Sequence, residues 1–171
     1  GTYRNFTLKF ADGSTFVPKD NDFNFTLPEG QNTLYGFDYN DTLTGNNQEN
    51  TISGGNGNDT IIGGKGNDNL QGEYGNDTYV WNLGDGLDYI SDNNGNNIIE
   101  FGEGITLENL TFERGNSNDS SNANNLYIFV NDDRNQGIII NYFFGLGTYR
   151  NFTLKFADGS TFVPDGRSEE R

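Results

Sequence analysis

Three aspartates recur every nine residues near the middle of the chain, each in the same local sequence. Residues 54–80 read GGNGNDTII, GGKGNDNLQ and GEYGNDTYV, so Gly is first and fourth, Asn fifth and Asp sixth. The aspartates are Asp59, Asp68 and Asp77. Carboxylates and backbone carbonyls are the hard oxygen ligands that Ca²⁺ takes, and glycine permits the positive φ angles that aim carbonyls inward. The pattern therefore indicates binding of a hard divalent cation in repeated turns.

The nonapeptide register extends over eight repeats, which begin at residues 27, 36, 45, 54, 63, 72, 83 and 92. The eighth position of every repeat is apolar: Leu34, Leu43, Ile52, Ile61, Leu70, Tyr79, Ile90 and Ile99. Trp81 and Asn82 form a two-residue slip between the sixth and seventh repeats. A nine-residue period predicts a tight turn followed by a very short strand, repeated as a parallel β-solenoid around one buried stack.

Two nonapeptides make one coil of such a solenoid, so turns on the same side are eighteen residues apart. Stacked strands lie about 4.8 Å apart, and a cation between two turns can take a carboxylate from each. One side carries Asp41, Asp59, Asp77 and Asn97 at the sixth position, which predicts two Asp–Asp sites and a weaker Asp77–Asn97 site. The other side carries Asn32, Asn50, Asp68 and Asp88. It predicts a weaker Asn50–Asp68 site and an Asp68–Asp88 site that the slip distorts; about three to five ions are expected.

These repeats resemble the calcium-binding nonapeptides of the RTX (haemolysin-type) family. The resemblance implies a right-handed parallel β-roll in which the sixth-position side chain and carbonyls of the glycine-rich turn hold Ca²⁺. Carried over residue by residue, it implies these metal ligands: Asp41, Asp59, Asp77, Asp68, Asp88, Gly36, Gly54, Asn56, Asn58, Gly63, Lys65, Asn67, Gly72, Tyr74, Asn76, Asn50 and Asn97. In the rival interpretation Asn-Asp and Gly-Asn merely favour turns; it explains one repeat but not turns kept in phase with an apolar position.

Residues 101–146 lack the nonapeptide register. Leu110–Arg114, Leu126–Asn131 and Gly137–Phe144 are rich in apolar and aromatic residues and predict strands, with a polar loop between the first two. Together with residues 147–164, the segment resembles the haemolysin-type calcium-binding related domain, which ends in a hairpin, here around Phe156-Ala157-Asp158-Gly159. The expected fold class is therefore all-β: a parallel roll whose open end is capped by C-terminal antiparallel strands.

Residues 1–18 and 147–164 are identical, which gives a spacing of 146 residues between the two copies. We interpret the chain as one unit of a tandem array that carries the tail of the preceding unit. The expected divisions are a hairpin at 1–18, a link at 19–26, the calcium-binding roll at 27–100, the cap at 101–164, and a tail or expression remnant at 165–171. The first hairpin should either cap the N-terminal end of the roll or remain an edge prone to self-association.

Composition excludes several classes of function. The net charge of −15 repels nucleic acids and anionic membranes. The chain has no Cys or His, so disulfides, thiolate metal sites and the usual general base are excluded, and we expect no enzyme. No apolar run has transmembrane length, and the N-terminus lacks the features of a signal peptide. A hydrophobic content of 32% would suggest disorder, but aromatic residues at 14% oppose it.

The leading hypothesis is a calcium-binding module that folds on Ca²⁺ binding after secretion. The resemblance implies a part of a large secreted RTX toxin or surface protein, exported by type I secretion from a Gram-negative bacterium. Its expected partners are calcium, neighbouring repeat units and a second copy through the duplicated hairpin. The alternative is a calcium-stabilised adhesive or carbohydrate-binding module, in which Tyr142, Phe143 and Phe144 could form the ligand platform, although core packing explains that run better.

Overall fold

The structure is a computed structural model that describes residues 24–92, 94–115, 123–145 and 151–164, with the backbone alone at 8–9 and 15–16. Among these residues it is all-β apart from one 3-10 turn, η1 (Leu107–Asn109). The strands are β1 (Leu8–Lys9), β2 (Thr15–Phe16), β3 (Asn24–Thr26), β4 (Thr33–Tyr35), β5 (Thr42–Thr44), β6 (Thr51–Asn56), β7 (Thr60–Ile62), β8 (Asn69–Tyr74), β9 (Thr78–Trp81), β10 (Leu87–Ile90), β11 (Asn97–Phe101), β12 (Leu110–Arg114), β13 (Leu126–Val130), β14 (Asp133–Ile140), β15 (Phe152–Lys155) and β16 (Thr161–Phe162).

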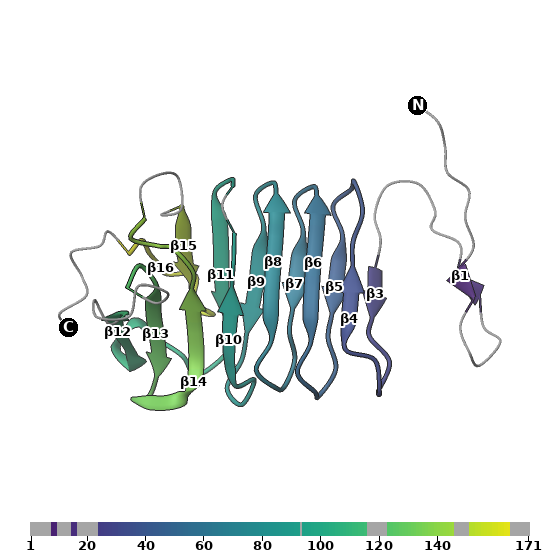
Figure 1. Ribbon diagram of the computed structural model, residues 1–171. Helices are drawn as coiled ribbons and strands as arrows, with labels where there is room; N and C mark the ends of the chain where they lie inside the picture. Colours follow the sequence, from purple (N-terminus) through teal and green to yellow (C-terminus); the bar gives the residue numbers. More distant parts are fainter. Residues whose placement is uncertain are drawn as a thin grey trace.

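Alternate strands belong to opposite faces of a parallel solenoid. One sheet has the order β12-β13-β14-β10-β8-β6-β4 and the other β16-β15-β11-β9-β7-β5-β3. In the second sheet Thr42 pairs with Thr60 and Thr60 with Thr78, so each rung lies eighteen residues after the one below it. Figure 1 shows the successive rungs side by side, with turns along both edges of the roll. The predicted two-nonapeptide coil is confirmed.

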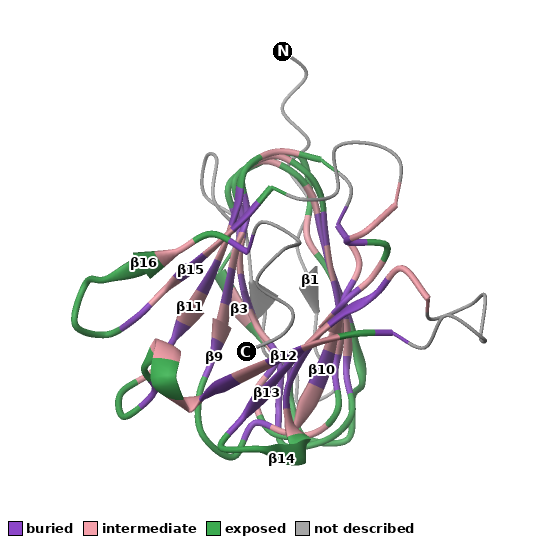
Figure 2. Ribbon diagram, turned by 90° about the vertical axis from the view of Figure 1, so that its left-hand side faces the viewer, coloured by how far each residue is buried: buried purple, intermediate pink, exposed green. Residues whose placement is uncertain are grey.

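The eighth-position residues form the core of the roll. All of them are buried, from Leu34 at 6% exposed to Leu43, Ile52, Ile61 and Ile99 at 0%. Seen along the roll, the two sheets enclose this stack and the exposed residues collect at the turns (Figure 2). A side chain every second residue points inward, since strand residues alternate between faces. One apolar position per nonapeptide is therefore enough to build a continuous core.

Ile61 and Ile62 provide a matched test of this core because they are chain neighbours on opposite faces of β7. Ile61 is fully buried, whereas Ile62 is only partly buried. In saturating Ca²⁺, Ile61→Ala is expected to lower the free energy of unfolding by about 2–5 kcal/mol, because it leaves a cavity in the stack. Ile62→Ala should cost clearly less. Urea unfolding of both variants checks this, and equal losses would contradict the assignment of the inner face.

The two-residue slip is absorbed without breaking either sheet. Beyond it, Ile90 pairs with Leu70 and Ile99 with Tyr79, so the rung spacing is 20 residues instead of 18. Trp81 is buried and its ring lies edge-on to Phe101, with the centroids 6.1 Å apart. The slip therefore adds a large aromatic side chain to the core near the C-terminal end of the roll.

The C-terminal strands continue both sheets and then close them. β14 pairs in parallel with β10, and β15 pairs in parallel with β11, so each sheet gains one more rung. Beyond these rungs β13 and β12 on one face and β16 on the other add antiparallel strands. The predicted antiparallel strands are present. In each sheet one further parallel strand, β14 or β15, lies between them and the roll.

The predicted strand at Gly137–Phe144 is displaced in the structure. β14 covers Asp133–Ile140, and residues 141–145 form a turn in which Tyr142 has a φ of 53°. The amide of Tyr142 donates to Oδ1 of Asn125 and that of Phe144 to the carbonyl of Asn124. This turn brings Phe143 into the core at 0% exposure. If the strand continued beyond the buried Ile140, alternation would place Phe143 on the opposite face. β12 has the predicted bounds, and β13 ends one residue early.

The expected link at 19–26 contains a strand. β3 pairs with β5 in the repeat register, with Phe25 opposite Leu43. Phe25 is nine residues before Leu34, so the apolar eighth position in fact begins one repeat earlier than predicted. Most of the hairpin at 1–18 and all of 165–171 lie outside the described residues, as does most of the polar loop. β1 and β2 form a two-stranded antiparallel sheet, in which Leu8 pairs with Phe16.

Candidate metal centres

The sixth-position side chains form two ladders along the turns. On one edge Oδ1 of Asp59 accepts the amide of Asp41 at 2.8 Å, and Oδ1 of Asp77 accepts that of Asp59 at 2.8 Å. Asn97 continues this edge by accepting the amide of Asp77 at 2.9 Å. On the opposite edge Asp68 accepts the amide of Asn50, and Asp88 that of Asp68. Asp59, Asp77, Asp68 and Asp88 thus each use one carboxylate oxygen to fix their turn to the neighbouring turn.

The second oxygen of the three central aspartates has no partner. Oδ2 of Asp59, Asp68 and Asp77 is buried without a hydrogen bond, and all three residues are at most 1% exposed. A buried, unpartnered carboxylate oxygen is costly unless a cation compensates its charge. These three residues belong to the repeats at 54, 63 and 72, which fit the nonapeptide template best. The turns whose sequences predict an ion most strongly are thus the ones with a free carboxylate oxygen.

The two preceding turns differ in this respect. Oδ2 of Asp41 accepts the amide of Phe37 at 2.7 Å, and Oδ1 of Asn50 accepts the amide of Asn46 at 2.8 Å. These repeats, GFDYND and GNNQEN, lack the second glycine of the template. In these two turns the side-chain oxygen of Asp41 or Asn50 that would face an ion already accepts a backbone amide of its own turn.

In the repeats at 36, 45, 54, 63 and 72 the first residue is glycine, and the position of its missing Cβ lies beside these oxygens; we call this position the cradle of that repeat. A Cβ on Gly54 would lie 2.2 Å from Oδ2 of Asp59 and 2.9 Å from the carbonyl oxygen of Gly72. At Gly36 the nearest atoms are the carbonyl oxygen of Gly54 and Oδ2 of Asp41, and at Gly63 the nearest is Oδ2 of Asp68. The cradles at Gly36 and Gly54 each gather a carboxylate oxygen of their own repeat and a carbonyl from the next rung, the donor types that Ca²⁺ takes, but only at Gly54 is that carboxylate oxygen without a hydrogen bond.

The turns also stack too closely for side chains at the fourth position. Gly75 has a φ of 143°, and a Cβ there would lie 1.5 Å from the carbonyl oxygen of Gly57 in the turn below. Any other residue would therefore force the stacked turns apart. This spacing explains why the fourth-position glycine persists from the fourth repeat onward.

Burial makes the ladder carboxyls harder to ionise. It raises the pKa of Asp59 and of Asp68 to about 6, that of Asp77 to about 7 and that of Asp88 to about 8. Backbone amide donors oppose this rise, and neighbouring carboxylates such as Asp41 beside Asp59 add to it. Without a cation, the folded roll therefore holds protons that the unfolded chain would release above a pKa of 3.8.

The calcium-free chain should consequently be more folded at pH 5 than at pH 8. A folded-state pKa above the unfolded value stabilises the fold at low pH, and this stabilisation is lost as the pH rises through the folded pKa values. The window here runs from below 4 to about 8. Circular dichroism in chelator across this range measures the effect. Greater β-sheet content at pH 8 than at pH 5 would contradict the sign.

The structure brings the predicted sixth-position ligands together and turns several others outward. Asp41, Asp59, Asp68, Asp77, Asp88, Asn50 and Asn97 are all buried. The fifth-position asparagines are exposed and form their own ladder: Asn58 accepts the amide of Asn76 at 2.8 Å. Lys65 and Tyr74 are exposed, and Asn56 donates to Asp38. At Asn56, Asn58, Lys65, Asn67, Tyr74 and Asn76, a role in metal binding is thus left to the main-chain carbonyls.

Two buried carboxylates were missed by the sequence reasoning. Asp92 is 4% exposed at the first position of the eighth repeat, where the template has glycine. Asp85 is 8% exposed at the third position of the seventh repeat, and its Oδ2 accepts the amide of Asn82 at 2.7 Å. For Asp92 the departure from glycine at the first position was the available signal, whereas the third position varies between repeats and gives no signal for Asp85. Among the described residues no group of three or more acidic side chains forms a metal site, so backbone oxygens must complete each cradle.

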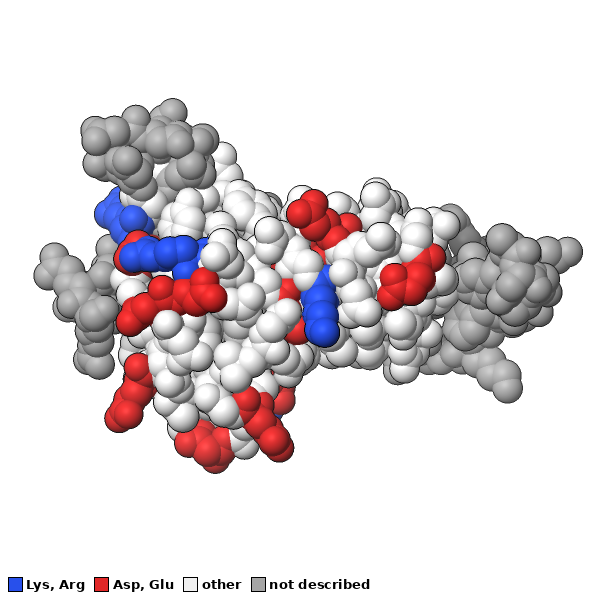
Figure 3. All heavy atoms as spheres, turned by 90° about the horizontal axis from the view of Figure 1, so that it is seen from below, with Lys and Arg blue, Asp and Glu red and all other residues white. Residues whose placement is uncertain are grey.

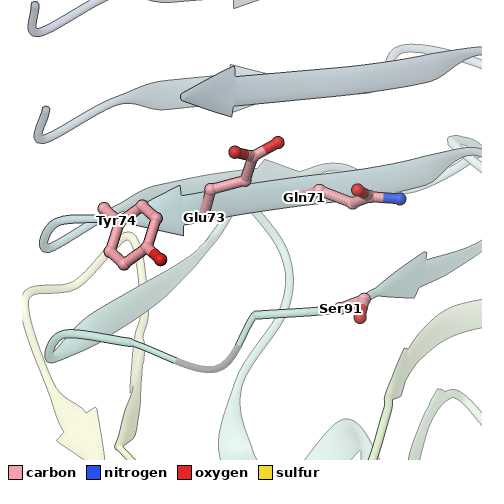
Figure 4. Close-up of a pocket in the computed structure, with 4 residues that line it drawn as sticks. All are labelled: Gln71, Glu73, Tyr74 and Ser91. Carbon is pink, nitrogen blue, oxygen red and sulfur yellow. The ribbon is translucent and has the colours of Figure 1, made fainter. Parts of the chain in front are cut away.

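Other surface features are less suited to a cation. An open cavity of about 270 Å³ is lined by Gln71, Glu73 and Tyr74 of β8 and by Ser91 (Figure 4). Only Glu73 of these carries a charge, and it accepts a hydrogen bond from the hydroxyl of Ser53. Acidic side chains are spread along the face shown in Figure 3, with fewer basic ones among them. The paired carboxylates lie inside the turns and not on this surface. In the described part of the chain, no helix is long and apolar enough to span a membrane.

The fold and the turns define a class of protein: a parallel β-solenoid with oxygen-lined turns between its rungs. Comparison with protein families narrows the class of the repeats. Residues 35–70 and 53–80 match the family model of the RTX calcium-binding nonapeptide repeat, which describes four copies of the repeat. Residues 35–80 are an RTX repeat block, and the chain contains a calcium-binding module. A search of curated proteins found no significant match to the chain.

Proposed function

We propose that this chain is a module that folds when it binds about three to five Ca²⁺ ions. The observation that carries the proposal is the set of three buried carboxylate oxygens without partners, on Asp59, Asp68 and Asp77. They lie in three successive turns, each beside a first-position glycine at which a Cβ would collide with that oxygen. Asp41 and Asp88 extend the two ladders and complete the expected Asp–Asp pairs.

Folding should depend on the ion because charge repulsion opposes the folded state and the apolar core is small. The chain carries a net charge of −15, and the roll places its sixth-position carboxylates one above another. The repeat template adds only one apolar inward side chain per nonapeptide to the core. The sites do not exist in the unfolded chain, so the free energy of ion binding becomes free energy of folding.

The dependence on Ca²⁺ suits a protein that leaves the cell. Extracellular calcium modules bind at about 10⁻⁴–10⁻³ M, a concentration that the cytosol does not reach. We propose a segment of a large secreted RTX toxin or surface protein, exported unfolded by type I secretion from a Gram-negative bacterium. The chain acts by binding and folding, and not as an enzyme.

The duplicated hairpin supports a place in a tandem array. Leu8 pairs with Phe16, and the equivalent Leu154 pairs with Phe162, so the described strand pairs of the two copies have the same antiparallel register. In the second copy Phe152 and Leu154 are buried against the roll through β11. The first copy is then the closing hairpin of a preceding unit, and residues 101–164 close this one as the haemolysin-type related domain. A free copy of the hairpin would also support self-association.

An adhesive role is the second candidate. The aromatic run at 142–144 is a poor platform, because Phe143 is fully buried and the guanidinium of Arg114 covers the ring of Phe144 at 4.7 Å. Exposed tyrosines elsewhere favour it more: Tyr35, Tyr39 and Tyr74 are 64%, 54% and 61% exposed. Binding to a glycan array that requires both Ca²⁺ and these tyrosines would support this candidate.

Equilibrium dialysis against Ca²⁺, with Mg²⁺ as competitor, tests the calcium proposal. We expect several ions per chain, half-saturation between about 10⁻⁴ and 10⁻³ M, and little competition from Mg²⁺, which demands a rigid octahedral shell. Tight binding at submicromolar Ca²⁺ would contradict the export switch, since the module would then fold before secretion. A chain that binds no Ca²⁺ would overturn the proposed function as a whole.

A further inference from the structure

The last cradle on one edge of the roll differs in composition from those before it. The sixth-position partner of Asp77 on the next rung is Asn97, whose Oδ1 accepts the amide of Asp77 and whose Nδ2 donates to the carbonyl of Asn94 at 2.9 Å. Where the earlier aspartates present a second oxygen, Asn97 presents an amide nitrogen. The sixth-position pair Asp77–Asn97 therefore has one carboxylate, whereas the preceding pair Asp59–Asp77 has two.

A carboxylate from another position fills the same space. Asp92 stands at the first position of the eighth repeat, in place of glycine, and its side chain is 4% exposed. A Cβ on Gly72 would lie 2.2 Å from Oδ2 of Asp77, 2.5 Å from Oδ2 of Asp92 and 2.6 Å from the hydroxyl of Tyr79. Three oxygens from three positions of the repeat thus surround one point. In the cradle at Gly54, a neutral carbonyl occupies the place that Asp92 takes here.

Tyr79 is also exceptional among the eighth-position residues, since the others are Phe25 and residues of Leu or Ile, which carry no polar group. Its hydroxyl donates to Oδ2 of Asp92 at 2.6 Å, which fixes the orientation of that carboxyl group. Oδ2 of Asp77 faces the same space, is buried, and has no hydrogen-bond donor. Two carboxylates therefore meet in a buried space beside one tyrosine hydroxyl, and their mutual repulsion must be offset by a shared proton or by a cation.

We propose that Asp77, Asp92 and the Tyr79 hydroxyl form a separate Ca²⁺ site at the end of this edge, in which Asp92 supplies the charge that Asn97 lacks. The inference rests on the proposed function, because it assigns one further ion of the same class to the roll. The cavity of Figure 4 lies along the same segments: Gln71 and Glu73 flank Gly72, and Ser91 precedes Asp92.

Charge compensation provides the test. Ca²⁺ stoichiometry would be measured by equilibrium dialysis for the unaltered chain, for Asp92→Asn, and for the double variant Asp92→Asn/Asn97→Asp. Glu103→Gln, which removes a charge from an exposed turn, is the control. Asp92→Asn should bind one ion fewer, the double variant should regain it, and the control should be unchanged. An Asp92→Asn variant with undiminished stoichiometry and affinity overturns the site, and a double variant that stays one ion short overturns the compensation by Asn97→Asp.

Terbium luminescence gives a second readout that does not depend on stoichiometry. Tb³⁺ occupies Ca²⁺ sites and is excited through nearby tyrosines, so Tyr79→Phe should lower the sensitised emission of the unaltered chain. The same change in an Asp92→Asn background should have a clearly smaller effect, since only an ion at the Asp59–Asp77 pair then remains near Tyr79. An equal loss in both backgrounds would overturn the site. If the unaltered chain bound neither Ca²⁺ nor Tb³⁺, the proposed function itself would fail, which is distinguishable from failure of this one site.

Discussion

Removal of calcium is expected to unfold the roll at neutral pH. Asp41, Asp59 and Asp77 stand on successive rungs of one edge, each linked to the next by an amide–carboxylate hydrogen bond. Burial raises the pKa of Asp59 to about 6 and of Asp77 to about 7, so without an ion each deprotonation near pH 7.5 acts against the folded state. With a hydrophobic content of 32%, the chain has little apolar burial to offset that cost.

Far-UV circular dichroism of the purified chain would measure this, first in EDTA and then during a Ca²⁺ titration. We expect a coil spectrum in EDTA and a cooperative transition to β-sheet as Ca²⁺ rises, with a parallel Mg²⁺ titration as the control. A complete β-sheet spectrum in EDTA at pH 7.5 would show that the roll does not need calcium, and the folding switch would have to be abandoned. A chain that stays disordered in millimolar Ca²⁺ would mean that the isolated unit needs its neighbours.

Asp59→Asn should have the largest effect of any single side-chain change at the turns. Asp59 belongs to two pairs, since its Oδ1 accepts the amide of Asp41 and its own amide donates to Asp77. Its Oδ2 is buried without a partner and lies beside the space that Gly54 leaves open. Asparagine keeps the shape but removes the charge from both pairs. We expect a loss of up to two ions, and at least about tenfold weaker overall Ca²⁺ affinity, equivalent to about 1.4 kcal/mol.

The sign of this effect should reverse when calcium is absent. Burial destabilises the ionised Asp59, so Asp59→Asn should leave the calcium-free chain at pH 7.5 no less folded than the unaltered one. Asp38→Asn is the matched control: it removes one charge from an exposed turn residue that accepts a hydrogen bond from Asn56. Isothermal titration and circular dichroism of both variants would decide. A variant Asp59→Asn that binds Ca²⁺ like the control would exclude Asp59 as a ligand.

The periodic part of the molecule could be predicted from its sequence. The apolar eighth position identified eight core residues from Leu34 to Ile99, and all are buried in one stack, whereas Trp81 in the slip joins the core without being predicted. The eighteen-residue spacing predicted which aspartates share an edge, and the ladder of Asp41, Asp59 and Asp77 confirms it. This success has a local cause: each turn and short strand is specified within nine residues, and each rung contacts only its neighbours.

Tertiary structure decided what the period does not encode. The Oδ2 atoms of Asp59, Asp68 and Asp77 lack donors while that of Asp41 has one, a difference that depends on the backbone path of each turn. Asp92 and Tyr79 meet at 2.6 Å although they are thirteen residues apart and out of step with the template. β14 and β15 join the roll through pairings 50 and 55 residues apart, such as Asp88 with Ile138 and Asn97 with Phe152. A repeat fixes contacts between adjacent rungs, whereas these long-range pairings depend on how the whole chain packs at the end of the roll.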